Sequence, residues 1–173
     1  MSGRWSKPTL VGTLVTLRPV SIDDTAAMWE MINDPEGNEL TDTTATFTFE
    51  QIVEWCASRG VQDERLDLAI VENATGDFAG EAVLNAYDAD DESANFRIAL
   101  RGPAWYGRGL GTEAATLIVV HGLTSIGLRR ITLTVLARNR RARRSYEKAG
   151  FRPTGETVEE GQTWVEMEIT AAR

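Results

Sequence analysis

Short stretches in which apolar and polar residues alternate recur along the chain, and this alternation predicts β-strands with one buried face. These stretches are residues 14–20, 67–71, 78–84, 95–100 and 130–136, followed by a hairpin of 150–158 and 162–169. Apolar positions spaced by three and four residues predict helices, of which one follows Ser21, one follows Thr48, and two cover 111–124 and 139–149. The polar, threonine-rich stretch 35–47 is expected to be a mobile loop.

The order of these elements, β-α-α-β-β-β-α-β-α-β-β, predicts an α/β (α+β) fold. We expect a mixed, mainly antiparallel central sheet of about seven strands flanked by about four helices. A doubly wound nucleotide-binding fold would need strands and helices to alternate throughout, and three successive strands in mid-chain argue against it. A single domain is expected over residues 1–173, with a loosely ordered segment at 1–12.

Charge is divided unevenly along the chain, although the net charge is only −8. Residues 1–92 carry a balance of −14, residues 93–155 carry +10, and the remaining residues carry −4. The local positive field of the middle part suits a small polyanionic ligand. The acidic first part indicates either a cationic second substrate or a solvated acidic surface.

Composition excludes several classes of protein. No stretch approaches the roughly 20 apolar residues that span a bilayer, so no membrane partner is expected. The N-terminus lacks the apolar run of a secretory signal, and Cys56 is the only cysteine, so a cytoplasmic protein without an internal disulfide is expected. Cys56 is interpreted as a buried apolar residue, and His121, the only histidine, as structural. These two residues and scattered acids form no ligand cluster, so no metal is expected.

A glycine-rich loop precedes the third predicted helix. Gly107, Gly109 and Gly111 let the backbone approach a ligand without interference from a Cβ atom. The amides of residues 108–112 can then point together at an oxygen-rich group. Thr112 stands where a dinucleotide fingerprint needs its third glycine, and no Gly-Lys-Ser/Thr of a P-loop is present. Taken alone, the pattern is typical of a phosphate-binding loop or of an ordinary turn.

The helix at 139–149 combines a tyrosine with a run of arginines. Tyr146 lies seven residues, about two turns, after Asn139, so both fall on one helix face. Tyr146 is either a core aromatic residue or a proton donor. The arginines from Arg138 to Arg144 form a solvated face, a phosphate contact or a nucleic-acid patch. The excess of acid elsewhere opposes a nucleic-acid partner.

Together these residues resemble the motifs of the GNAT superfamily of acyl-coenzyme A-dependent N-acyltransferases. That family has a (Gln/Arg)-x-x-Gly-x-(Gly/Ala) loop followed, one strand later, by Asn-x-x-Ala-x-x-x-Tyr-x-x-x-Gly-Phe. The second motif is complete in this chain, with Asn139, Ala142, Tyr146, Gly150 and Phe151.

The first motif is matched at Gly109 and Gly111, with Tyr106 in place of Gln or Arg. An aromatic residue there, followed by Thr-Glu-Ala, is similar to the Rim-type branch that includes the ribosomal-protein N-terminal acetyltransferases. The stretch Leu17-Arg18-Pro19, with Asp24, is also similar to that branch.

The resemblance implies a GNAT-like fold that uses acetyl-CoA, or another acyl-CoA, as co-substrate. Strand 95–100 would bind pantetheine through its backbone where it splays from strand 130–136, and the glycine-rich loop would hold the pyrophosphate. Asn139 would touch the coenzyme arm, and Arg144 the adenosine phosphates. The cofactor-binding residues implied in this way are Ile98, Ala99, Leu100, Arg108, Gly109, Leu110, Gly111, Thr112, Asn139 and Arg144.

The resemblance also implies direct attack by an amine on the thioester, with Tyr146 as the acid that protonates the departing thiolate. A tyrosine with a pKa near ~10 stays protonated at neutral pH and can serve as this donor. An amide near Ile98 would stabilise the charged carbonyl oxygen. Related sequences often have a glutamate where this chain has Asn95, so Glu81 is the candidate general base. The alternative is that Glu81 pairs with an arginine or is a solvated strand residue.

We therefore expect an N-acyltransferase that moves an acetyl group to a primary amine of a small molecule or a peptide, as a monomer or a homodimer. The acceptor pocket is expected between the first two helices, the loop 35–47 and the turn 85–93. Acids that could recognise a cation there, or lie on the solvated surface, are Glu39, Asp42, Asp88 and Asp90. The alternatives are a non-catalytic acyl-CoA sensor, favoured by Asn95, and an RNA-associated protein.

Overall fold

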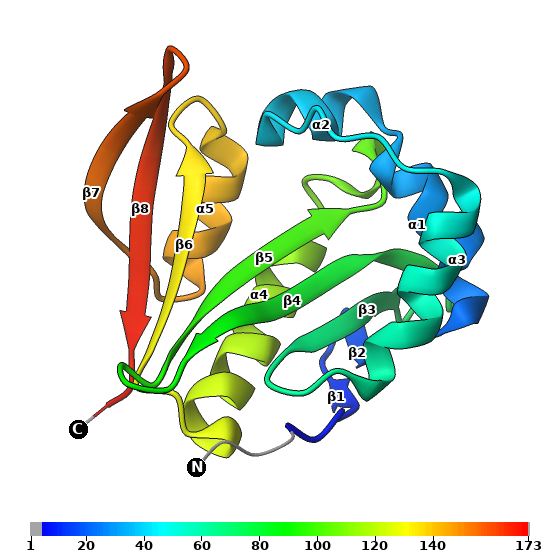
Figure 1. The fold of residues 1–173 in the computed structure, drawn as a ribbon, viewed down its shortest axis with the longest axis horizontal. Coiled ribbons are helices and arrows are strands. Elements are labelled where there is room, and N and C mark those ends of the chain that lie inside the picture. Colours follow the sequence, from blue (N-terminus) through cyan, green and yellow to red (C-terminus); the bar gives the residue numbers. More distant parts are fainter. Residues whose placement is uncertain (1–4, 173) are drawn as a thin grey trace.

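The alternating stretches form one eight-stranded sheet in the computed structural model, which describes residues 5–172 (Figure 1). In their order across the sheet, the strands are β1 (Leu10–Val11), β2 (Val15–Pro19), β3 (Leu66–Glu72), β4 (Phe78–Asp88), β5 (Ser93–Leu100), β6 (Arg130–Leu136), β8 (Gln162–Thr170) and β7 (Arg152–Glu159). Neighbouring strands are antiparallel except β5 and β6, which are parallel. The predicted mixed, mainly antiparallel α/β fold is confirmed.

The α-helices of the described residues are α1 (Thr25–Ile32), α2 (Pro35–Thr41), α3 (Phe49–Ser58), α4 (Leu110–His121) and α5 (Arg140–Lys148). A π-helical turn over Gly122–Ile126 prolongs α4, where the sequence predicted a helix as far as residue 124. Figure 1 shows α4 and α5 on one face of the sheet, and α1 and α3 next to β3 and β4. Within residues 5–172, no helix has the length and apolar character needed to cross a bilayer.

Two elements were not predicted. Helix α2 lies in the stretch that was expected to be a loop, and it raises the number of helices from about four to five. Asp34 caps it by accepting a hydrogen bond from the Gly37 amide at 2.9 Å, and Pro35 occupies its first position. Because α2 buries no residue, it shows no hydrophobic periodicity. Strand β1 has two residues and is too short for a visible alternation.

The N-terminal segment packs against the rest of the chain over its described part. The expectation of a loosely ordered segment falls partly on residues 1–4, which lie outside the described residues. Trp5 is buried and meets Tyr87 edge-to-face, with ring centroids 5.4 Å apart. Leu10 and Val11 pair with β2. The described part of this segment therefore packs against the sheet through a large buried indole side chain.

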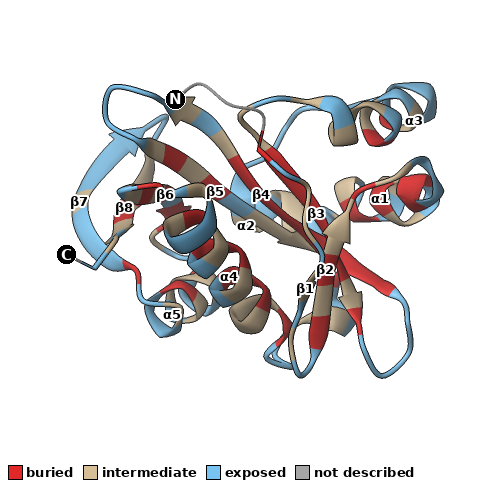
Figure 2. Cartoon of the chain, turned by 90° about the horizontal axis from the view of Figure 1, so that it is seen from below, coloured by how far each residue is buried: buried red, intermediate tan, exposed pale blue. Residues whose placement is uncertain are grey.

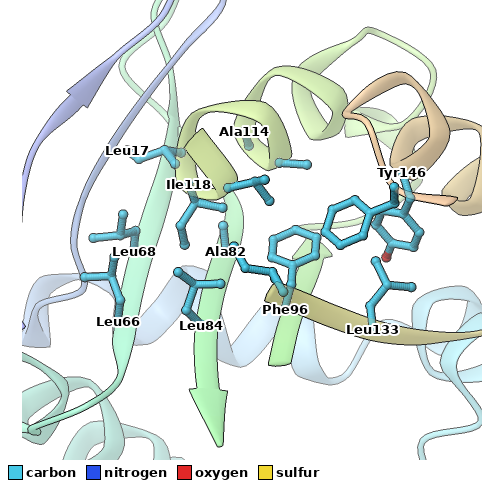
Figure 3. Close-up of a cluster of buried hydrophobic side chains, with 14 of the residues drawn as sticks. Leu17, Leu66, Leu68, Ala82, Leu84, Phe96, Ala114, Ile118, Leu133 and Tyr146 are labelled. Atoms are coloured by element: carbon cyan, nitrogen blue, oxygen red, sulfur yellow. The ribbon is translucent and has the colours of Figure 1, made fainter. Parts of the chain in front are cut away.

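The sheet separates two clusters of buried apolar side chains. On one face, α4 packs Ala114 and Ile118 against Leu68 and Leu84 of the central strands (Figure 3). On the other face, α1 and α3 cover a smaller cluster that includes Cys56. Figure 2 shows buried residues along the central strands and the inner sides of α1 and α4, while β7 is exposed. The alternation of the strands therefore supplies both clusters.

An ion pair joins Arg18 and Asp24, two residues of the N-terminal stretch that resembles the Rim-type branch. The guanidinium of Arg18 at the end of β2 donates two hydrogen bonds, of 2.7 and 2.9 Å, to the buried carboxylate of Asp24. The same carboxylate accepts a hydrogen bond from the Ser21 amide at 2.9 Å. The three residues fix the turn from β2 into α1, and Asp24 raises the pKa of Arg18.

Glu113, in the first turn of α4, ties this helix to the N-terminal strands. Its carboxylate accepts hydrogen bonds from the amides of Thr13, Leu14 and Val15 at 2.7 to 2.8 Å. A Cβ atom at Gly12 would lie 2.8 Å from the same carboxyl group. The turn between β1 and β2 is therefore built around this side chain.

We expect Glu113→Ala to lower the free energy of unfolding by about 1–3 kcal/mol, because three amides lose a charged acceptor. Chemical denaturation measures this change. Glu147→Ala, which removes an exposed carboxylate from α5, is the control and should alter stability by less than about 0.5 kcal/mol. Equal effects of the two substitutions would contradict the role of Glu113.

Candidate active site

A cavity opens where β5 and β6 part. The two strands pair only through three residues of each, Ser93–Asn95 with Arg130–Thr132, and then diverge (Figure 1). The cavity has a volume of about 710 Å³, and residues 95–100 and 134–136 line its two sides. The predicted splay between these strands is confirmed.

The backbone of β5 presents polar groups to this opening. The amide of Arg101 donates to the carbonyl of Ala79, and hydrogen-bonded pairs alternate with non-hydrogen-bonded pairs in an antiparallel ladder. The amides and carbonyls of Ile98 and Leu100 therefore point away from β4. Beyond Asn95, β5 has no partner strand on that side within the described residues. These groups remain for a ligand that adds to the strand edge.

The N-terminus of α4 forms another wall of the cavity. Gly109 precedes the helix with a φ of 80° and Gly107 has a φ of 70°, conformations that favour glycine. No side chain caps the helix. Among the described residues, the amides from Arg108 to Thr112 donate no hydrogen bond, and the first intrahelical bond runs from Glu113 to Gly109. The end of the helix dipole and free donors therefore coincide, which is the arrangement that binds a phosphate.

Positive side chains of α5 stand beside this wall. Arg141, Arg144 and Lys148 follow helical spacing, line the cavity and are exposed. Thr112 of α4 and Ser145 of α5 are joined by a hydrogen bond of 3.1 Å, so the basic face of α5 lies next to the free amides. The sequence-predicted Arg144 belongs to this group.

Two predicted cofactor residues have their side chains engaged elsewhere. The amide nitrogen of Asn139 donates to the carbonyl of Leu40 at 3.2 Å, and its oxygen caps α5 by accepting from the Ala142 amide at 3.3 Å. The guanidinium of Arg108 pairs with the buried carboxylate of Glu72 and does not line the cavity. Asn139 therefore shapes the cavity wall, and Arg108 can contribute only its backbone amide.

Tyr106 links three parts of the site, a role that the sequence did not reveal. The guanidinium of Arg141 lies 3.6 Å from the centroid of its ring, and its hydroxyl donates to Asp34 at 3.3 Å. Because Asp34 caps α2, this chain of contacts joins the glycine-rich loop, α5 and α2. Burial and the nearby Asp34 raise the pKa of Tyr106.

Tyr146 lies in the cavity wall among aromatic rings. Its ring meets that of Phe96 edge-to-face, with centroids 5.9 Å apart (Figure 3). It meets Phe151 in the same way, with centroids 6.2 Å apart. Burial raises the pKa of Tyr146 to about 12. No described residue forms a hydrogen bond with its hydroxyl. The phenol therefore stays protonated near neutral pH and has its proton free to donate.

Glu81 enters the cavity from β4, on the face covered by α1 and α3. Its Oε1 lies 3.4 Å from Nη2 of Arg97, while its buried Oε2 has no hydrogen-bond partner among the described residues. Burial raises the pKa of Glu81, with Arg97 opposing this shift and Asp67 reinforcing it. The carboxylate is therefore a stronger base than an exposed glutamate.

The acceptor end differs from the prediction. Helix α1 contributes Met31 and Ile32 to the cavity, and the segment after α2 contributes Phe47. Neither α3 nor the turn 85–93 lines it, because β4 extends to Asp88 and directs that turn away. The acids proposed for recognition of a cation do not line it either: Glu39, Asp42, Asp88 and Asp90.

The remaining candidates lie outside the cavity. Cys56 is buried between α3 and the sheet, and burial raises the pKa of its thiol, as expected for an apolar structural residue. His121, at the end of α4, also does not line the cavity. The described part of the chain contains no group of three metal-ligating side chains.

The fold and the site together define an acetyltransferase. The sequence matches the family model described as the acetyltransferase (GNAT) domain over residues 15–152. The chain therefore belongs to the GNAT acetyltransferase family, whose members use acetyl-CoA. A comparison with curated proteins finds no match.

Solved structures share this fold. A GNAT-family acetyltransferase from Bacillus anthracis is 18% identical, covers 94% of this chain and 98% of its own, and has a TM-score of 0.81. A spermidine N-acetyltransferase from Vibrio cholerae, in complex with CoA and spermine, is 20% identical, with coverages of 92% and 96% and a TM-score of 0.80. A candidate ribosomal-protein-serine acetyltransferase from Vibrio cholerae is 14% identical, with coverages of 96% and 99% and a TM-score of 0.78.

Glu81→Gln should stabilise the protein at neutral pH by roughly 1–3 kcal/mol, because it replaces a buried negative charge, whose desolvation the single contact with Arg97 offsets only in part, with a neutral amide. The raised pKa means that folding favours the protonated acid, so the stability that wild-type Glu81 contributes is present below its ordinary pKa of 4.5 and is lost as the pH rises through the folded value. Thermal unfolding at several pH values should show the gain at neutral pH and no gain below 4.5. A gain that does not vary with pH would contradict this account.

Proposed function

We propose that the cavity binds acetyl-CoA and transfers its acetyl group to a primary amine by direct attack. The observation that carries this proposal is the arrangement within one cavity of free amides at the N-terminus of α4, the unpaired edge of β5 and the phenol of Tyr146. Each feature matches one part of the cofactor. The Vibrio cholerae spermidine N-acetyltransferase, which shares the fold, was solved in complex with CoA.

The diphosphate would lie at the amides of residues 108–112. Arg144 and Lys148 line the same cavity from α5 and would supply positive charge for the phosphates of the adenosine part. The amide-bearing pantetheine arm would extend along β5, where the outward-pointing groups of Ile98 and Leu100 can hydrogen-bond to it as another strand would. This placement brings the thioester to the buried part of the cavity.

Tyr146 would protonate the thiolate as it leaves. A phenol with a pKa of about 12 is a weak acid in water, but the departing thiolate enters the same apolar surroundings. Desolvation raises the pKa of the thiol for the same reason that it raises the pKa of the phenol. The two values therefore move together, and proton transfer remains feasible.

Glu81, which lines the cavity from β4, would accept the proton of the attacking amine through a water molecule. The N–C bond forms as the amine attacks the carbonyl carbon, and the C–S bond then breaks. The nitrogen loses a proton to Glu81, and the sulfur gains one from Tyr146. Exchange with solvent restores both residues, and the outward amide of Ile98 would stabilise the carbonyl oxygen while it is charged.

Gly109→Ala should weaken the binding of CoA by tenfold or more, because alanine resists the φ of 80° that aims the amides at the diphosphate. Calorimetry measures the affinity. Gly127→Ala is the matched control, since Gly127 has a similar φ of 87° and lies outside the cavity. It should cost similar stability and leave the affinity for CoA unchanged. Equal affinities in the two variants would contradict the proposed diphosphate site.

Tyr146→Phe should lower the turnover of acetyl-CoA with an amine acceptor by about 10²-fold or more, as expected for the loss of a positioned acid. The release of free thiol measures turnover, and calorimetry should show CoA affinity within about twofold of wild type. Because phenylalanine keeps the packing against Phe96 and Phe151, folding should be preserved. Unaltered turnover would remove the acid role. CoA binding without turnover on any amine would instead indicate a sensor.

A further inference from the structure

The charged residues of the cavity are distributed unevenly. Three cations, Arg141, Arg144 and Lys148, belong to α5 beside the proposed diphosphate site. At the other end, where α1 and the segment after α2 form the walls, the charged side chains that line the cavity are Glu81 and Arg97. The acceptor end therefore holds one acid and one base rather than a cluster of carboxylates.

Glu81 and Arg97 form an ion pair through a single long contact, and most of the hydrogen-bond donors of Arg97 are not used in it. They approach through a single contact of 3.4 Å between Oε1 and Nη2. Oε2 of Glu81 has no partner among the described residues, and the side chain of Arg97 is 46% exposed. A guanidinium has five N–H donors in a planar fork that fits a carboxylate. Most of the donors of Arg97 thus remain for a ligand.

The position of this pair on the sheet is suited to an acceptor. Glu81 is the cross-strand partner of Ala99, and Arg97 lies two residues before Ala99 on β5, so both side chains rise from the same face. Arg97 directly precedes Ile98, whose outward amide was assigned to the carbonyl oxygen of the thioester. A molecule held by Arg97 therefore lies beside the proposed point of transfer.

We propose that the acceptor is an amine that carries a carboxylate close to its nitrogen, as an α-amino acid does, and that Arg97 binds this carboxylate while the amino group lies at Glu81. This inference rests on the proposed acetyl transfer. The carboxylate and the guanidinium, whose nearest atoms are 3.4 Å apart, can pair with the amino and carboxyl groups of a molecule in which one carbon atom separates the two groups. The ammonium form loses one proton to solvent before the attack, and the nitrogen passes its second proton to Glu81. Met31, Ile32 and Phe47 give the same end of the cavity apolar walls that suit an apolar side chain.

The same arrangement disfavours a polycationic acceptor. A polyamine carries several positive charges, and each needs an acid or a solvated position to offset its desolvation. The described cavity lining offers one carboxylate, which Arg97 already contacts, and places a further positive charge beside it. Like charges at such distances repel, so a second ammonium group would be rejected by Arg97.

The first experiment compares acceptors with the wild-type enzyme. Thiol release from acetyl-CoA is measured with an apolar α-amino acid, with the corresponding amino acid amide, which lacks the carboxylate, and with spermidine. We expect kcat/KM to be at least tenfold higher for the amino acid than for its amide, the difference expected for one charge-assisted hydrogen-bonded pair. Preference for spermidine or for the amide would overturn the inference and leave the proposed acetyl transfer intact.

The second experiment separates binding of the substrate by Arg97 from an indirect effect on Glu81. Arg97→Gln should raise KM for the amino acid by roughly 10- to 100-fold and leave KM for the amide within about twofold. Arg97→Lys should recover part of the affinity, because lysine keeps the charge but not the planar fork. A shift of both substrates by the same factor would mean that Arg97 only tunes Glu81, and would overturn the inference.

Arg129→Gln is the control for a general effect of charge, because Arg129 is exposed and does not line the cavity. It should leave both KM values unchanged. Absence of turnover with every acceptor, despite CoA binding, would instead reject the proposed function itself. The two proposals therefore fail through different results.

Discussion

The hydrogen bonds between β5 and β6 stop after three residue pairs, and the organisation of the site depends on this interruption. A continuous ladder would satisfy the outward groups of Ile98 and Leu100 and would close the cavity. Because the strands diverge, those groups face an opening that also receives the N-terminus of α4 and one face of α5. Unpaired backbone groups are costly when buried, so the opening must hold water or a ligand with its own amides. The pantetheine arm of a coenzyme meets this requirement.

The low polarity around the cavity raises the pKa of both proposed catalytic groups, with a different consequence for each. It keeps Tyr146 protonated and holds Glu81 as a stronger base than an exposed glutamate, because burial raises the pKa of both. One physical effect therefore raises the pKa of both the proposed acid and the proposed base. The contact with Arg97 opposes the rise in the pKa of Glu81.

Elements with a buried face were predictable from the sequence, since burial creates the alternation of β4 and the spacing of α4. Helix α2 was not, because it buries no residue and is defined by the cap at Asp34. Gly109 and Tyr146, which line the cavity, could be proposed from the sequence because the spacing of their motifs is local. Arg97 was not proposed, because its place beside Glu81 comes from the register of β4 with β5, which puts both side chains on the same face. Had the turn between β4 and β5 been placed correctly in the sequence, counting alternate residues from it along the two antiparallel strands would have shown that Glu81 and Arg97 share a face.

One acidic residue in α4 has a consequence for the specificity of its N-terminus. A carboxylate in the first turn of a helix ordinarily competes with any anion for the exposed amide hydrogens and the positive pole there. The carboxylate of Glu113 instead accepts hydrogen bonds from three amides of the loop between the first two strands. The carboxylate of Glu113 therefore does not occupy the free amides at the N-terminus of α4. Loss of that loop would free the carboxylate of Glu113 beside the proposed diphosphate site, so the edge of the sheet at β1 and β2 would affect how strongly this end of α4 binds an anion.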